Sequence, residues 1–222
     1  MNYDGLLIIF AREPVPGRVK TRLAKDIGND AAAELYDLML RHVIKNAVSS
    51  RYDIELWKTS ESSGSYFAEL IPGAFIRDQS EGNIGERMSG AFRSGFAGGY
   101  RKICIIGTDC PDASSNDIIE AFYLLENNGL VLGPSFDGGY YLIGLSKFYS
   151  GLFEGISWST ASVFPETVEK ARFLDIGFVS LCAKVDIDDM TGLREYILKN
   201  PGTELAAAFE NVLRKSGHEK GD

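Results

Sequence analysis

The chain has 222 residues, 45% of them hydrophobic and 24% charged, and carries a formal net charge of -8 at pH 7. This composition is typical of a globular protein with enough chain for one sizeable core. A sequence pI near 4.9 argues against nucleic-acid binding, which needs a basic face. Without an apolar run of about 18 residues or an N-terminal signal pattern, we expect no transmembrane segment and no leader. Cys104, Cys110 and Cys182 form no Cys-x-x-Cys pair, which favours free thiols in a reducing cytoplasm.

Strand and helix patterns alternate along the chain. Apolar runs predict strands at residues 5–10, 53–57, 74–77, 102–107, 129–133, 140–145 and 179–185. Helical spacing predicts helices at 30–50, 84–96, 114–126 and 161–173, and in two stretches near the C-terminus. This alternation indicates an α/β fold with a Rossmann-like, mainly parallel sheet flanked by helices. We expect one domain, residues 1–215, and a flexible tail, residues 216–222.

A basic loop follows the first predicted strand. It carries four cations opposed only by Glu13: Arg12, Arg18, Lys20 and Arg22. If residues 18–22 are extended, the last three cations crowd on one side. Gly17 lets the backbone approach a ligand, and loops at the carboxyl ends of such strands often bind nucleotides. The loop therefore predicts a phosphate site, with a solvated basic turn as the alternative.

Carboxylates follow two other predicted strands. Asp109 ends the central strand, on the same edge of the sheet as the basic loop, and Asp112 stands where the chain turns. Asp188 follows the last predicted strand. Carboxylate oxygens at such an edge suit Mg²⁺ or Mn²⁺. The alternative for Asp109 and Asp112 is a turn or cap residue, and either Asp188 or Asp189 is a candidate N-cap of the next helix.

A glycine-rich segment and an aromatic one are candidates for binding a second substrate. Gly138 and Gly139 lie between two predicted strands, so they form either a hairpin turn or, with Asp137, a backbone cradle. The second segment has an aromatic ring and two hydroxyls that suit an acceptor: Trp158, Ser159 and Thr160. Its alternative is a buried tryptophan followed by a helix cap.

These motifs together resemble a family of bacterial and archaeal GT-A-like proteins, often called nucleotide-diphospho-sugar transferases or glycosyltransferases. The resemblance runs in order through nearly the whole chain. It rests on five segments: Phe10-Ala-Arg-Glu-Pro-Val-Pro-Gly-Arg-Val-Lys-Thr-Arg-Leu-Ala24, Gly82-Asn-Ile-Gly-Glu-Arg-Met88, Gly107-Thr-Asp-Cys-Pro111, Gly133-Pro-Ser-Phe-Asp-Gly-Gly-Tyr-Tyr-Leu-Ile-Gly-Leu145 and Trp158-Ser-Thr160.

The resemblance implies a GT-A fold, with a nucleotide-binding sheet and a smaller acceptor-binding part. A more distant similarity is to 2-phospholactate guanylyltransferase and molybdopterin guanylyltransferase. In those enzymes a loop like residues 20–23 holds the nucleoside triphosphate, and carboxylates matching Asp109 and Asp188 bind metal. The first loop here has Ala11-Arg-Glu-Pro where the nucleotidyltransferases have Ala-Gly-Gly. The similarity therefore supports nucleotide binding but does not decide which reaction the protein catalyses.

The expected function is a metal-dependent transferase with a nucleotide-sugar donor. Arg12, Gly17, Arg18, Lys20 and Arg22 would hold the diphosphate, while Gln79 and Gly82 would lie near the base or ribose. Mg²⁺ or Mn²⁺ on Asp109, assisted by Asp188, would neutralise the leaving group. The catalytic candidates are Lys20 and Asp137, the latter orienting or deprotonating the acceptor hydroxyl.

Histidine is a poor candidate for acid–base chemistry here, because His42 falls inside a predicted helix and His218 in the tail. One rival function is nucleotidyl transfer from a nucleoside triphosphate, and a second is nucleotide binding without catalysis. The sequence leaves open the base, the sugar, the small-molecule acceptor and the oligomeric state.

Overall fold

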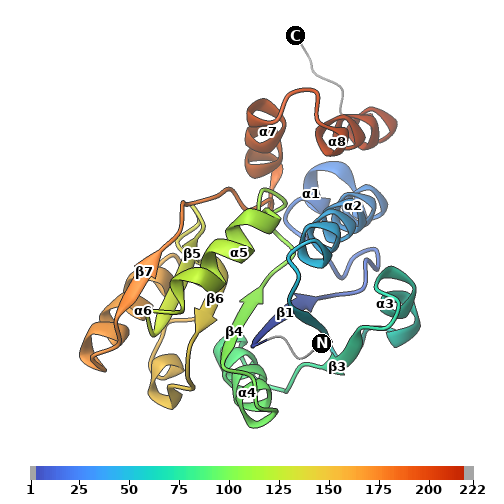
Figure 1. Ribbon diagram of the computed structural model, residues 1–222. Coiled ribbons are helices and arrows are strands. Elements are labelled where there is room, and N and C mark those ends of the chain that lie inside the picture. The colour runs from blue at the N-terminus through green and yellow to red at the C-terminus, as the bar shows by residue number, and fades with distance from the viewer. Residues whose placement is uncertain (1–3, 218–222) are drawn as a thin grey trace.

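The computed structural model describes residues 4–217, which build one seven-stranded sheet between helices (Figure 1). The sheet order is β3-β2-β1-β4-β6-β5-β7. The strands are β1 (Gly5–Ala11), β2 (Asp53–Lys58), β3 (Phe75–Asp78), β4 (Lys102–Ile106), β5 (Leu130–Pro134), β6 (Tyr140–Leu145) and β7 (Phe178–Ser180). Every neighbouring pair is parallel except the two that β6 makes, with β4 and with β5. The predicted α/β fold with a mainly parallel sheet is confirmed.

Helices cover both faces of the sheet (Figure 1). They are α1 (Ala24–Ile27), α2 (Asn29–Val48), α3 (Gly64–Leu70), α4 (Ile84–Ala97), α5 (Ser115–Leu124), the 3-10 helix η1 (Ser150–Phe153), α6 (Val163–Phe173), α7 (Met190–Lys199) and α8 (Glu204–Lys215). Side chains of α2, α3 and α5 pack on one face, and side chains of α4, α6 and η1 on the other. All of β1 is buried, as expected for a strand covered on both sides.

A third apolar cluster lies beyond the carboxyl edge of the central strands. It joins α1 and α2 to α7 and α8 through buried residues such as Leu23, Leu35, Ile187, Leu193 and Phe209. In Figure 1, α7 and α8 lie next to α1 and α2 at the top of the molecule. This cluster anchors the chain on both sides of the candidate site, because Leu23 follows the basic loop and Ile187 precedes Asp188.

Two helix caps resolve alternatives that the sequence leaves open. Ser114 caps α5 in a reciprocal capping box with Asp117, so Asp112 does not cap it. Asp189 caps α7 by accepting from the backbone N–H groups of Thr191 and Gly192. Asp188 is therefore free of capping and remains a candidate for the site.

The last strand is shorter than predicted. We expected residues 179–185, but β7 ends at Ser180, and only an isolated bridge joins Ser135 to Lys184 further on. The neighbouring strand β5 ends at Pro134, which has no N–H to continue the ladder. The short elements α1, α3 and η1 were not predicted. No helix within residues 4–217 is long and apolar enough to cross a bilayer.

The predicted tail starts at the edge of the described chain. Ser216 and Gly217 follow α8, and the rest of the tail, including His218, lies outside the described residues.

Candidate functional site

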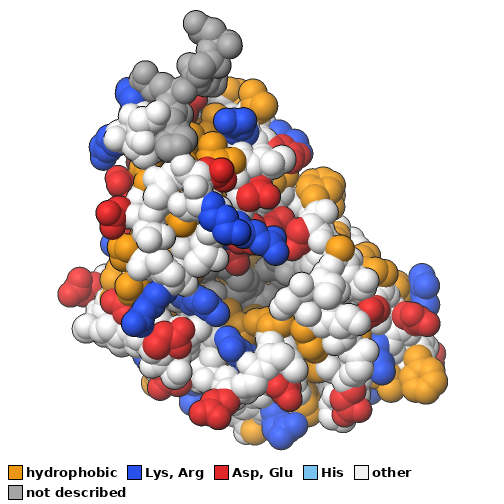
Figure 2. Space-filling model, turned by 180° about the vertical axis from the view of Figure 1, so that it is seen from behind, with side chains coloured by type: hydrophobic (Ala, Val, Ile, Leu, Met, Phe, Trp, Pro, Cys, Tyr) orange, Lys and Arg blue, Asp and Glu red, His pale blue; other side chains and the backbone are white. Residues whose placement is uncertain are grey.

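A pocket of about 840 Å³ opens where β1 and β4 end. Figure 2 shows a hollow with acidic and basic side chains on one rim and hydrophobic side chains near the opposite wall. Among the residues that sequence analysis selected, those lining the pocket are Arg12, Arg18, Lys20, Arg22, Gln79, Asp109, Asp137, Gly139, Trp158, Ser159, Thr160 and Asp188. Gly17, Gly82 and Gly138 do not line it. Most of the predicted site thus lies around one cavity.

The basic loop is not extended, so the condition for three alternating cations does not hold, although Arg18, Lys20 and Arg22 all line the pocket. The loop turns twice, and Lys20 lies between the turns with a positive φ of 46°. The side chain of Lys20 is only 3% exposed, whereas Arg22 on the same loop is 72% exposed. Val19 is buried in the sheet core and Leu23 in the helical cluster, so the loop is held on both sides of Lys20. This double anchoring directs the lysine inward.

The ammonium of Lys20 lies between two carboxylates. Its Nζ is 2.5 Å from Oδ1 of Asp109 and 3.4 Å from Oδ1 of Asp188. Burial lowers the pKa of Lys20, but the two carboxylates outweigh burial and raise the pKa above its ordinary value. Lys20 is therefore a charged group, and one cation contacts both predicted metal ligands.

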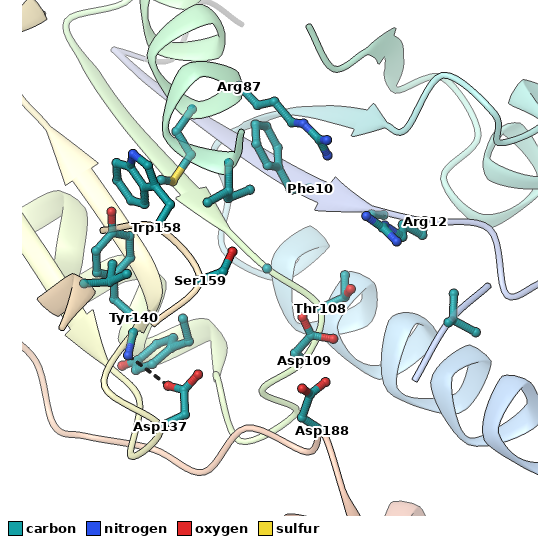
Figure 3. A pocket seen from close by; sticks show the side chains of 18 of the residues that line it. Phe10, Arg12, Arg87, Thr108, Asp109, Asp137, Tyr140, Trp158, Ser159 and Asp188 are labelled. Carbon is teal, nitrogen blue, oxygen red and sulfur yellow. Dashed lines mark hydrogen bonds between the residues drawn. The ribbon is translucent and has the colours of Figure 1, made fainter. Parts of the chain in front are cut away.

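Asp109 and Asp188 lie together although they are 79 positions apart in the chain. The backbone N–H of Ile187 donates to the carbonyl of Asp109 at 2.8 Å, and the Cys110 thiol donates to the carbonyl of Val185. These bonds fasten the segment before α7 across the end of β4. Figure 3 shows the two carboxylates side by side, with Asp137 across the pocket from them.

A buried hydroxyl network lies beneath the carboxylates. Tyr36 of α2 accepts a hydrogen bond from the backbone N–H of Arg12 and pairs with the hydroxyl of Thr108 at 2.9 Å. Burial first, and then the charge of Asp109, raise the pKa of Tyr36. Tyr36 therefore stays a neutral phenol that ties the ends of β1 and β4 together, a positioning role that sequence analysis did not reveal.

Three guanidinium groups add positive charge at the pocket. Arg12 and Arg18 are exposed at its wall, and Arg22 Nη1 is 3.5 Å from Oδ2 of Asp188. Glu13, the only acid of the loop, is engaged elsewhere, because its carboxylate accepts from the backbone N–H of Ser63. Lys20 and Arg22 are thus opposed by the site's own aspartates, and the exposed side chains of Arg12 and Arg18 are open to an anionic ligand.

A fourth arginine, Arg87, lies at the same pocket (Figure 3). It stands in the first turn of α4, and its Nε donates to the carbonyl of Gly82. Gly82 therefore supports the start of α4 instead of lining the pocket. Gln79 does line it, with its amide donating to the carbonyl of Trp57. Sequence analysis did not select Arg87, although it lies in the segment 82–88 that contributes to the family resemblance, and a cation near a helix N-terminus is electrostatically unfavourable.

The glycine pair forms the hairpin turn between β5 and β6. Gly138 donates to the carbonyl of Ser135, and the N–H of Gly139 donates to Oδ1 of Asp137 at 2.9 Å. Oδ1 of Asp137 also accepts from the hydroxyl of Ser135 at 2.5 Å. These bonds hold Asp137 at the pocket wall through one carboxylate oxygen. Burial first, and then the charge of Asp137, raise the pKa of nearby Asp186 to about 6, so this wall has an excess of negative charge.

The aromatic segment closes the pocket opposite the basic loop. The half-buried ring of Trp158 stacks on Phe153 and lies so close to Gly85 of α4 that a Cβ there would overlap it. Thr160 accepts from the N–H of Ser162, but the N-cap position of α6 is Ser162 and no side chain caps the helix, so the alternative of a helix cap at Ser159 or Thr160 is wrong. Ser159 is exposed at the pocket with a positive φ of 64°. The segment thus combines structural contacts with one hydroxyl open to a ligand.

Gly138→Ala is expected to destabilise the hairpin that holds Asp137. Its φ is +93°, and an added Cβ would lie 2.2 Å from the carbonyl oxygen of Ala161. Strain and overlap together should cost about 2–3 kcal/mol, a fall in melting temperature of roughly 5–10 °C for a chain of this size. Gly99→Ala is the matched control, because Gly99 has a φ of +95° with nothing within 4 Å of the added Cβ. Equal melting temperatures for the two variants would contradict the close contact with Ala161.

Comparison with known structures defines the class of fold. The chain superposes on a crystal structure from Desulfovibrio desulfuricans G20, described as a candidate nucleotide-diphospho-sugar transferase, with a TM-score of 0.89 and 29% identity over 96% of this chain and 95% of that one. This confirms the predicted nucleotide-diphospho-sugar transferase fold. Residues 42–160 match the family described as "Uncharacterized protein conserved in bacteria (DUF2064)", and the chain belongs to that family. No curated protein matches it.

More distant structures share the fold alone. A cytidylyltransferase from Leptospira borgpetersenii has a TM-score of 0.57 and 13% identity over 96% of this chain and 95% of that one. A protein from Mycobacterium tuberculosis H37Rv, in complex with manganese, has a TM-score of 0.54 and 14% identity over 88% of this chain and 98% of that one.

Proposed function

We propose that this protein is a divalent-metal-dependent transferase whose donor is a nucleotide-sugar. The observation that carries the proposal is the cluster at the ends of β1 and β4, where Asp109 and Asp188 face Lys20 beside the exposed Arg12, Arg18 and Arg22. A pocket with two carboxylates and several cations suits a diphosphate whose charge is shared between a metal ion and side chains. The similarity to the Desulfovibrio protein supports a nucleotide-sugar donor.

The two carboxylates fit Mg²⁺ or Mn²⁺. Both already contact one cationic group, the Lys20 ammonium, so a single cation can lie between them. No cluster of three or more Asp, Glu, His or Cys side chains that could hold a metal occurs within residues 4–217. Mg²⁺ commonly binds in this way, through one or two carboxylates together with water and substrate phosphates. The bound ion would neutralise charge on the leaving diphosphate, and the manganese complex of a protein with the same fold supports this assignment.

The pocket offers residues for each side of a glycosyl transfer. The acceptor oxygen would attack the anomeric carbon of the donor, and the bond from that carbon to the diphosphate oxygen would break. The electron pair would leave with the nucleoside diphosphate, which Arg18 and Arg22 would hold. The acceptor proton would pass to Oδ2 of Asp137, because Oδ1 is engaged by Ser135 and Gly139.

Asp137→Asn is expected to lower the rate of transfer by roughly 10²–10⁴-fold, the usual contribution of a general base. The affinity for the donor should stay within about threefold, because Asp137 lies across the pocket from Arg12 and Arg87 and an amide oxygen can still accept the same hydrogen bonds. Steady-state rates and calorimetric titration of the donor measure the two effects. A variant that transfers as fast as the wild type would remove Asp137 from the reaction.

The second candidate function is nucleotidyl transfer, which the shared fold of the Leptospira cytidylyltransferase favours. The same cations would then hold a triphosphate, and a phosphorylated acceptor would attack its α-phosphorus with loss of pyrophosphate. A thermal-shift screen of nucleotides and nucleotide-sugars, with and without Mg²⁺ or Mn²⁺, would identify the donor. Release of a nucleoside diphosphate supports glycosyl transfer, and release of pyrophosphate supports nucleotidyl transfer. Tight binding without turnover would indicate a binding protein.

We propose that the protein acts in the cytoplasm, and the free thiols of Cys104, Cys110 and Cys182 support this proposal.

A further inference from the structure

The place that suits a metal ion already contains a positive charge. The ammonium of Lys20 contacts Oδ1 of both Asp109 and Asp188, at 2.5 Å and 3.4 Å. The two carboxylate side chains are 56% and 47% exposed, whereas the lysine side chain is 3% exposed. A divalent ion approaching from the pocket therefore meets two carboxylates that a buried cation has partly neutralised.

The fold holds the lysine in this position. Its backbone has a φ of 46°, in the left-handed region that non-glycine residues rarely adopt. The carbonyl of Lys20 accepts from the N–H of Ala24, and the neighbouring Val19 is buried in the sheet core. A strained backbone persists only where its surroundings determine it, and such residues cluster at binding sites. The contact between Lys20 and the carboxylates is thus built into the loop.

A metal ion and the ammonium cannot both lie between the carboxylates without strong repulsion between like charges at short range. If the ammonium withdrew alone, it would be left as a buried charge without a partner, which is costly. Phosphate oxygens remove this difficulty, because they can accept the hydrogen bonds of Lys20 while they also bind the metal. The long side chain of lysine can turn from carboxylate to phosphate while its backbone stays in place.

We propose that Lys20 acts as the counter-ion of Asp109 and Asp188, and that its ammonium moves to the phosphates when a metal–nucleotide complex binds. The inference rests on the proposed function and specifies its ligand. The site takes the divalent ion and the polyphosphate as one complex, and it binds the free ion poorly. Lys20 makes the two ligands interdependent, so each should raise the affinity of the other by the same factor.

The test is Mn²⁺ binding, followed by the electron paramagnetic resonance signal of the free ion, with and without a nucleoside diphosphate. Without nucleotide, Lys20→Met should bind Mn²⁺ about tenfold or more tightly than the wild type, because the competing charge is gone. The factor by which nucleoside diphosphate raises Mn²⁺ affinity should fall by about tenfold or more in the variant. Lys20→Gln should behave in the same way, and it retains a hydrogen-bond donor for the carboxylates if Lys20→Met does not fold.

Lys25→Met is the matched control, since it removes the same charge from an exposed position of α1, five residues along the chain, and should leave Mn²⁺ binding unchanged. The proposal is overturned if the folded Lys20 variants bind free Mn²⁺ no better than the wild type does. If the wild type still binds the metal–nucleotide complex in that case, the proposed function stands. If the Lys20 variants gain Mn²⁺ affinity but no protein binds nucleotide, the move of Lys20 to the phosphates is overturned together with the proposed function, and only the competition between Lys20 and the metal ion is supported.

Discussion

Asp109→Asn is expected to weaken Mn²⁺-dependent binding of a nucleoside diphosphate by about 100-fold or more, since even residues that only support metal ligands contribute 10–100-fold. Asp109 follows β4, and its carboxylate faces the pocket beside Asp188 (Figure 3). An amide is a much poorer ligand for a hard divalent cation than a carboxylate is. Calorimetric titration of nucleoside diphosphate with Mn²⁺, and again with a chelator, measures the effect.

The melting temperature without ligand should fall by only a few degrees in Asp109→Asn. Lys20 loses a charged partner, but the asparagine oxygen can still accept its hydrogen bond and Asp188 remains. Asp112→Asn is the matched control, because that carboxylate accepts from the side chain of Asn200 and does not line the pocket. If Asp109→Asn binds the metal–nucleotide complex as tightly as Asp112→Asn does, Asp109 is not a metal ligand.

Arg22→Ala is expected to weaken nucleoside diphosphate binding by roughly 10–100-fold, the effect of losing one hydrogen bond to a charged group. Binding of the bare nucleoside should change little, because the guanidinium is expected to contact only phosphate. The side chain is 72% exposed and its ion pair with Asp188 is 3.5 Å long, so the melting temperature should hardly change. Parallel titrations with nucleoside and nucleoside diphosphate separate the two contributions.

Arg41→Ala serves as the control for Arg22→Ala. Arg41 is an exposed arginine of α2 that pairs with Asp37 and lies outside the pocket. An equal loss of nucleoside and diphosphate binding in Arg22→Ala would indicate a general defect of the pocket. If neither nucleoside binding nor diphosphate binding is weakened, the loop is a solvated basic turn, which is the alternative given in the sequence analysis.

Much of the fold could be predicted because the strands differ clearly in pattern from the helices. Residues 103–106 are apolar throughout, as expected for a strand that is buried on both faces, and they form most of β4. Elements as short as α1 and α3 carry too few residues to show a period. The predicted strand 179–185 was too long because residues 181 and 185 are buried although the chain no longer pairs with β5 as a strand there. The apolar pattern therefore continues beyond the end of β7.

Sequence analysis selected many of the residues that line the pocket but did not predict the contacts among them. Strand ends at one edge of a parallel sheet bring Asp109 and the basic loop together, and topology alone supports that inference. The inward turn of Lys20 depends on the burial of Val19 and Leu23 in two different clusters, a tertiary effect that local spacing does not reveal. The same limit applies to Tyr36, whose place among other buried residues of α2 resembles that of an ordinary core residue.

The most direct test of the central claim is calorimetric titration of the wild-type protein with one nucleoside and with its diphosphate, each with Mn²⁺ and with a chelator. The pocket geometry predicts that the diphosphate binds at least about 100-fold more tightly than the nucleoside does when Mn²⁺ is present. It also predicts that most of this difference disappears with the chelator, since Asp109 and Asp188 would then bind Lys20 in place of a metal. Equal affinities for nucleoside and diphosphate, or a diphosphate affinity that the chelator leaves unchanged, would contradict a metal–nucleotide site at the ends of β1 and β4.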